Sequence, residues 1–133
     1  MTLIERLEKA GEGSRAIDGA LALAFSEAPA WATKHHERQP ELWSDGNFGL
    51  RAKTWLAPHY STSLDAALAL AERVLPGWCV AQIGQGDDRK WFVELREGYR
   101  TSFNRVAMSP VGVPTPALAL CLAVLRATKE QAS

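Results

Sequence analysis

Apolar residues recur at helical spacing in two stretches of the chain that have nearly the same sequence. Residues 14–24 (SRAIDGALALA) and 61–71 (STSLDAALALA) align without a gap and share Ser, Asp, Ala, Leu, Ala, Leu and Ala. In the second stretch the apolar residues follow the i, i+3, i+4, i+7 spacing of an amphipathic helix. The pattern predicts a helix over residues 62–75 and a helical N-terminus over residues 2–26.

Local signals mark the ends of the predicted helices. Thr62 and Asp65 have the form of a capping box with Asp in place of Glu, and Pro76 follows the last periodic residue. A third Ala/Leu-rich phrase, TPALALCLAVLRA, begins at prolines suited to the first turn of a helix. It predicts a helix over residues 115–129. Because alanine is small, all three phrases are expected to lie close to a flat partner, which indicates packing on a sheet.

Three runs in the second half of the chain have the composition of strands. They cover residues 77–84, 90–97 and 101–109, and turn-rich connectors separate them, which predicts an antiparallel meander. Strict alternation predicts that one face carries Cys79, Ala81, Ile83, Trp91, Val93, Leu95, Val106 and Met108. The other face mixes apolar and charged residues, so both faces are expected to need cover. The predicted fold is α+β: an α/β/α sandwich in which an antiparallel β-meander of three to four strands is covered by Ala/Leu-rich helices.

Residues 28–60 form the least regular part of the sequence. ELWSDGNFGL is typical of a short hairpin that turns at Asp-Gly. LRAKTWLAP is typical of an edge strand, in which Arg51, Lys53 and Pro58 discourage pairing with other chains. An irregular segment of this length in a compact domain is commonly functional or partly disordered.

Composition and charge narrow the possible functions. The 133 residues fit a single domain over residues 1–133, and the 15 basic and 15 acidic side chains cancel. A neutral chain has no net field that attracts nucleic acid or an anionic membrane. No signal peptide or bilayer-spanning stretch is evident, which favours a cytoplasmic location. Cys79 and Cys121 lack a CxxC spacing and are expected to be buried free thiols without a disulfide.

No group of residues predicts catalysis or a cofactor. His35, His36 and His59 have no HxxxH or HxxE spacing and are too few for a zinc site, so no metal is expected. The hydroxyl residues that follow His59 lie at a predicted helix start, where capping explains them, and no GxSxG motif is present. The sequence therefore favours a protein that is not an enzyme.

Three motifs carry a family resemblance. IERLEKAGEGSRAIDGALALA, W..PHYSTSLDAALALAERVLPGW and PTPALALCLAVLRA occur in this order from about Leu3 to Ala127. Together they resemble the phage ABA sandwich domain family, small proteins encoded by bacteriophages and prophages. The intervening WATKHHERQPELWSDGNFGLRAK is longer and more charged than the family pattern. The resemblance implies an α/β/α sandwich, a phage origin and a bacterial cytoplasm, and it brings no established activity or catalytic residue.

Aromatic and arginine residues outside the predicted helices indicate a binding surface. Five tryptophans are many for a chain of this size, and Trp and Arg are over-represented in interface hot spots. The predicted surface combines residues 43–60 with the later strands. Its candidate residues are Trp55, His59, Tyr60, Arg96, Arg100 and Arg105. The alternative is that the tryptophans are core residues and the arginines ordinary surface charges.

Three functions remain. The first is a non-enzymatic phage- or prophage-encoded accessory protein that binds a host or phage protein, with an anti-defence or host-takeover role. The second is a small-molecule sponge that sequesters a nucleotide by tryptophan stacking and arginine clamps. The third is an RNA-binding module, because one helix, three strands and a last helix follow the order of double-stranded-RNA-binding domains. The last helix begins without Lys or Arg to contact phosphate, so RNA binding ranks last.

Overall fold

The computed structural model describes residues 2–33, 39–46, 53–98, 106–108 and 112–132 of the chain. It contains helices and antiparallel strands, which confirms the mixed α and β composition. The helices are α1 (Leu3–Lys9), α2 (Arg15–Ala24), α3 (Leu64–Val74) and α4 (Pro116–Ala132). The strands are β1 (Leu42–Ser44), β2 (Thr54–Leu56), β3 (Trp78–Gln85), β4 (Trp91–Glu97) and β5 (Val106–Met108).

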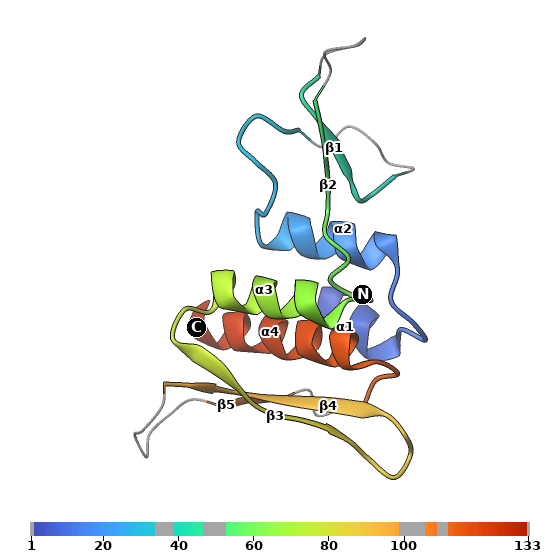
Figure 1. The fold of residues 1–133 in the computed structure, drawn as a ribbon, viewed down its shortest axis with the longest axis vertical. Coiled ribbons are helices and arrows are strands. Elements are labelled where there is room, and N and C mark those ends of the chain that lie inside the picture. Colours follow the sequence, from blue (N-terminus) through green and yellow to red (C-terminus); the bar gives the residue numbers. More distant parts are fainter. Residues whose placement is uncertain (1, 34–38, 47–52, 99–105, 109–111, 133) are drawn as a thin grey trace.

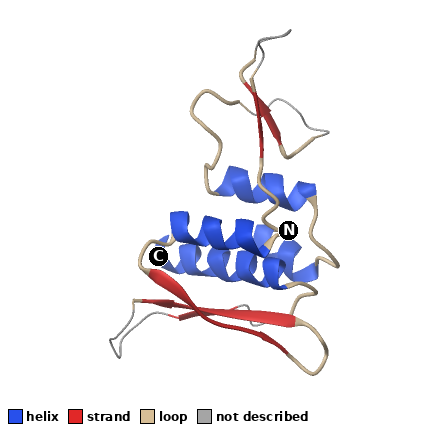
Figure 2. Cartoon of the chain, in the orientation of Figure 1, coloured by secondary structure: helices blue, strands red, loops and turns tan. Residues whose placement is uncertain are grey.

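The elements are stacked along the long axis of the molecule (Figure 1). The sheet β3-β4-β5 lies at one end, followed by α4 and α3, then by α2, and the pair β1-β2 projects at the opposite end. Helix α4 contacts β4, β5, α3 and α1, so it is the element that joins the sheet to the helices. Figure 2 shows the two groups of strands on opposite sides of the helices.

A serine or threonine hydroxyl caps the start of each of the four described helices, and at α4 it is Thr115, which accepts from the Leu118 N–H. Thr2, Ser14 and Ser63 each accept a hydrogen bond from a backbone N–H in the first turn of α1, α2 and α3. The predicted capping box at Thr62 is therefore wrong by one residue, because Ser63 supplies the cap. Gly77, which has φ +86°, turns the chain after α3 into β3, a conformation that glycine adopts without strain.

A β-bulge corrects the predicted faces of the sheet. Val80 pairs with Leu95 but Gln82 pairs with Glu94, so Ala81 is an additional residue in β3. The alternation therefore reverses at this point: Trp78, Val80 and Ile83 pack against the core, whereas the strict alternation predicted Cys79 and Ala81 there. The same core face receives Trp91, Val93 and Leu95 from β4, as predicted. In the next strand Ala107, and not Val106 or Met108, is the register partner of Leu95.

The described helices lie over one face of the larger sheet (Figures 1 and 2). On the outer face, Phe92 lies across Gly84, where an added Cβ would come within 2.5 Å of the ring. The α/β/α sandwich is therefore not confirmed, although the α+β class is.

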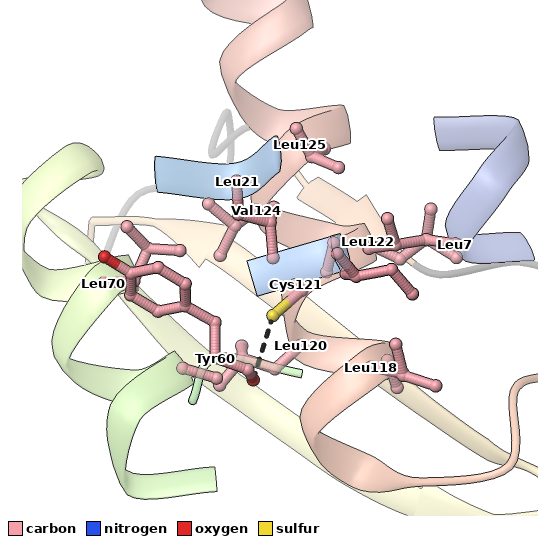
Figure 3. Close-up of a cluster of buried hydrophobic side chains, with 14 of the residues drawn as sticks. Leu7, Leu21, Tyr60, Leu70, Leu118, Leu120, Cys121, Leu122, Val124 and Leu125 are labelled. Carbon is pink, nitrogen blue, oxygen red and sulfur yellow. Dashed lines mark hydrogen bonds between the residues drawn. The ribbon is translucent and has the colours of Figure 1, made fainter. Parts of the chain in front are cut away.

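Helix α4 is the centre of the hydrophobic core (Figure 3). Every residue from 117 to 125 is buried, so this helix is apolar on all sides over two turns. It needs this composition because it lies between the sheet, α1 and α3. Leu120 on α4 is fully buried, whereas Leu68 on α3 is only partly buried at the edge of the core. No described helix is both long and apolar enough to cross a membrane.

Candidate functional site

The structure does not bring the predicted binding residues together. Trp55 lies on β2 and Arg96 on β4, at opposite ends of the molecule with the helices between them (Figure 1). His59 is exposed in the connection between β2 and α3. Arg100 and Arg105 lie outside the described residues. One surface that combines Trp55 with Arg96 is therefore not present.

Tyr60, one of the predicted binding residues, lies in the hydrophobic core. Its side chain is fully buried, and its hydroxyl donates a hydrogen bond to Glu27 Oε1 at 2.9 Å. Arg73 from α3 forms an ion pair with the same Glu27 carboxylate. Burial, and then the hydrogen bond to Glu27, raise the pKa of Tyr60 well above its usual range. The cluster therefore fastens the chain after α2 to α3, and the Tyr60 side chain predicted to contact a ligand is not presented to solvent.

A buried polar network fastens α2 to the chain that precedes α3. Asp18 and Ser61 are both fully buried. Asp18 Oδ1 accepts hydrogen bonds from the Ser61 backbone N–H (2.8 Å) and hydroxyl (2.7 Å), and Oδ2 accepts one from Arg15 (2.8 Å). The backbone N–H of Ser14 donates to the Ser61 hydroxyl at 3.0 Å. Since each carboxylate oxygen has a protein partner and no exposure, the network acts as a structural link.

Cys121 lies near this network and is also closed to solvent. Its thiol donates a hydrogen bond to the carbonyl oxygen of Tyr60 at 3.3 Å (dashed line in Figure 3). Burial, and then the nearby charge of Asp18, raise the pKa of Cys121 well above its usual range. A buried thiol that stays protonated is unreactive, because the thiolate is the nucleophile. Cys79 is half-buried on β3, and both cysteines are free.

Two hollows lie on the described part of the structure. The larger, of about 680 Å³, is a shallow groove between α1 and the second half of α4, where Glu8 forms an ion pair with Arg126. The smaller, of about 210 Å³, lies between α3 and β3 and has mainly apolar walls. Within the described residues, no three His, Cys, Asp or Glu side chains are grouped so that they hold a metal ion.

The projecting pair β1-β2 has its own small aromatic core. Trp43 and Trp55 are register partners in the two strands. Their rings meet edge to face, with centroids 5.1 Å apart and planes at 79°. Trp43 is buried, and Thr33 extends this sheet by pairing with Ser44. At the base, α2 touches the chain that enters β1: a Cβ on Gly19 would lie 2.1 Å from the carbonyl oxygen of Pro40. The strands are therefore attached to the body through tight backbone contacts.

Two of the large apolar side chains that are exposed among the described residues, Trp31 and Leu56, lie beside or on the projecting pair of strands. Among the residues that the structure describes, the large apolar side chains that are exposed are Leu23 on α2 (63%), Trp31 (42%) and Leu56 on β2 (59%). The Lys53 ammonium lies 5.9 Å from the centroid of the Trp31 ring, within the range of a cation–π contact. We call Trp31, Lys53, Thr54 and Leu56 the hairpin surface. Of these, only Lys53 was singled out in the sequence, as part of a predicted edge strand.

Comparisons of the chain with protein-family models, with curated proteins and with solved structures found no match. The resemblance to the phage ABA sandwich domain family therefore stays a prediction based on the three sequence motifs.

Proposed function

We propose that this chain is a non-enzymatic accessory protein that binds another protein through the hairpin surface. The observation that carries the proposal is the location of the exposed apolar side chains. Trp31 and Leu56 are exposed at the projecting end, whereas the described large apolar side chains of β3, β4 and α4 are buried or half-buried. Exposed aromatic and apolar groups on a projecting element are typical of interaction sites.

The buried polar residues support a role without catalysis. Ser61, Asp18 and Cys121 are all fully buried: the Ser61 hydroxyl donates to the Asp18 carboxylate, and the Cys121 thiol donates to the carbonyl oxygen of Tyr60. A nucleophile or general base must reach the proton or atom on which it acts, and these groups are closed to solvent. Their hydrogen bonds link α2 and α4 to the chain before α3, which is a structural role.

The partner is proposed to be a host or phage protein, in keeping with the sequence motifs. A phage origin, a cytoplasmic location and an α/β/α sandwich belong to the same proposal. The nucleotide sponge is less well supported, because Trp55 and Arg96 are too far apart to form one aromatic and arginine clamp. RNA binding is also less well supported, because Ala117 and Leu118 in the first turn of α4 are buried and cannot contact phosphate.

Site-specific photo-crosslinking tests the proposal. A photoreactive residue is placed at position 31 or 56, and at position 82 as the matched control, because Gln82 is exposed on β3 at the other end. Expression in a bacterial host, followed by irradiation, is expected to give a discrete crosslinked species from positions 31 and 56 that position 82 does not give. Crosslinks from position 82 alone, or the same products from all three positions, would contradict the proposal.

A further inference from the structure

The backbone of β2 offers hydrogen-bonding groups on the side that faces away from β1. The Asp45 N–H donates to Lys53 O at 3.1 Å, and the Ala57 N–H donates to Glu41 O at 2.8 Å. Because bonded pairs alternate in an antiparallel ladder, Trp43 and Trp55 form the bonded pair between these two. The N–H and C=O groups of Thr54 and Leu56 therefore point away from β1.

The two edges of this small sheet differ. On the side of β1, Thr33 and Ser44 exchange backbone hydrogen bonds of 2.7 and 3.0 Å, so that edge is already extended. On the side of β2, no strand among the described residues pairs with Thr54 or Leu56. The open edge thus coincides with the exposed side chain of Leu56.

Building on the proposed function, we infer that the edge of β2 binds an acidic, extended segment of the partner protein by strand addition. Thr54 and Leu56 are two residues apart, so their outward groups recur about 6.8 Å apart in an antiparallel strand. An extended backbone repeats its own N–H and C=O groups at this spacing, and it is the ligand that matches them. Leu56 then supplies an apolar contact beside the ladder.

Charge selects an acidic partner over a second copy of the chain. Lys53 is exposed beside β2, and no Asp or Glu lies between it and Leu64, whereas the acidic residues of this sheet, Glu41 and Asp45, lie on the β1 side. Two copies paired through β2 would bring like charges together, which is unfavourable across a ladder, whereas a partner strand with Asp or Glu would be attracted. Pro58 has no N–H and ends the pairing after Ala57, so the site accepts a short segment.

The probes that test this inference are three hexapeptides with blocked ends. The first alternates glutamate and valine, the second alternates lysine and valine, and the third is the glutamate peptide with N-methyl groups on alternate residues. Each is titrated into the full ¹⁵N-labelled chain, and amide shifts are followed. We expect the glutamate peptide to shift the amides of Thr54 and Leu56 most strongly, with affinity at least about tenfold above that of the other two.

Variants at position 56 separate backbone pairing from side-chain contact. Leu56→Pro removes an N–H that makes no hydrogen bond to β1, and the preceding Trp55 is already extended, as a residue before proline prefers. It is expected to lower the affinity for the glutamate peptide at least about tenfold, whereas Leu56→Val, which keeps the N–H, changes it about twofold or less. The near-ultraviolet circular dichroism of the Trp43–Trp55 pair reports that the hairpin stays folded in both variants.

The outcomes distinguish this inference from the proposed function. If Leu56→Pro leaves peptide binding intact, or the lysine peptide binds as well as the glutamate peptide, strand addition by an acidic segment is wrong. If crosslinks from position 31 also survive in Leu56→Pro, the proposed function stands without the inferred mode. A concentration-dependent dimer in sedimentation that Leu56→Pro abolishes would show that a second copy is the occupant and would overturn the acidic partner.

Discussion

The two antiparallel sheets of this protein use aromatic and apolar residues in different ways. In β3 and β4 the face toward the helices is buried against α4, and Val93 and Leu95 are essentially inaccessible. In β1 and β2 the strands are three residues long, and Leu56 is 59% exposed. A sheet that serves the core places its large apolar side chains inside. The projecting sheet instead leaves Leu56 on the surface, as the proposed binding role requires.

The aligned stretches in α2 and α3 show the same contrast at the level of single residues. Asp18 is buried and bonded to Ser61, whereas its aligned counterpart Asp65 is exposed on α3. Ser14 caps α2, whereas its counterpart Ser61 bonds across to α2. The two helices therefore share a sequence pattern but have different neighbours, which allows matched substitutions.

The largest effect is expected in the core at the sheet end. Leu120→Ala removes a fully buried side chain of α4 and is expected to lower the free energy of unfolding by about 2–5 kcal/mol. Leu68→Ala, at a partly buried position, should cost less than Leu120→Ala, and Leu56→Ala should stay within about 0.5 kcal/mol. Chemical denaturation measures all three. Equal losses for Leu120→Ala and Leu56→Ala would remove the contrast between the two sheets.

The next effect compares the two aligned aspartates. Asp18→Ala leaves the buried Ser61 N–H without its acceptor and removes one acceptor each from the Ser61 hydroxyl and Arg15, which keep the carbonyl oxygens of Ser14 and Ala57, so it is expected to cost about 2–4 kcal/mol. Asp65→Ala removes an exposed carboxylate in the first turn of α3, which should cost about 0.5 kcal/mol. Thermal or denaturant unfolding measures the loss of stability in each variant. Similar losses would mean that the buried network does not link α2 to the chain before α3.

A small effect of the opposite sign is expected in the turn between β3 and β4. Arg89 has φ +64°, and its N–H donates to Gly86 O at 2.9 Å, so an L-residue occupies a left-handed position in a tight turn. Arg89→Gly is expected to raise the free energy of unfolding by about 0.5–1 kcal/mol, because glycine adopts this conformation without strain. The substitution lies far from the hairpin surface and should leave crosslinking from position 56 unchanged. A loss of stability would argue that the arginine side chain makes a compensating contact.

Hydrophobic periodicity predicted the helices and the long strands because these elements bury one face. It placed α3 and α4 to within two or three residues, since their Ala/Leu pattern, prolines and capping residues agree. It gave the wrong inner residues in β3 because one extra residue, Ala81, reverses the alternation, and a bulge has no clear signal in this sequence. The sequence also could not tell which of two neighbouring hydroxyl residues, Thr62 or Ser63, caps α3.

The candidate site was harder to predict because the solvent exposure of each residue depends on tertiary packing. Tyr60 was expected to be a binding residue, but its side chain is buried and its hydroxyl donates a hydrogen bond to Glu27, 33 residues earlier in the chain. Arg96 and Trp55 belong to residue types that are common in interfaces, but the helices lie between the strands β4 and β2 that carry them. Exposure of Trp31 and Leu56 follows from the projection of β1 and β2, which only the tertiary structure reveals.

Amide hydrogen exchange in the isolated protein tests the central claim most directly, because it reports whether the edge of β2 is open. The N–H of Trp55 faces β1, whereas those of Thr54 and Leu56 face outward. The account predicts that Thr54 and Leu56 exchange nearly as fast as in an unstructured peptide and that Trp55 exchanges at least about tenfold more slowly. Protection of Thr54 and Leu56 equal to that of Trp55 would show that the edge is already paired and would contradict the account.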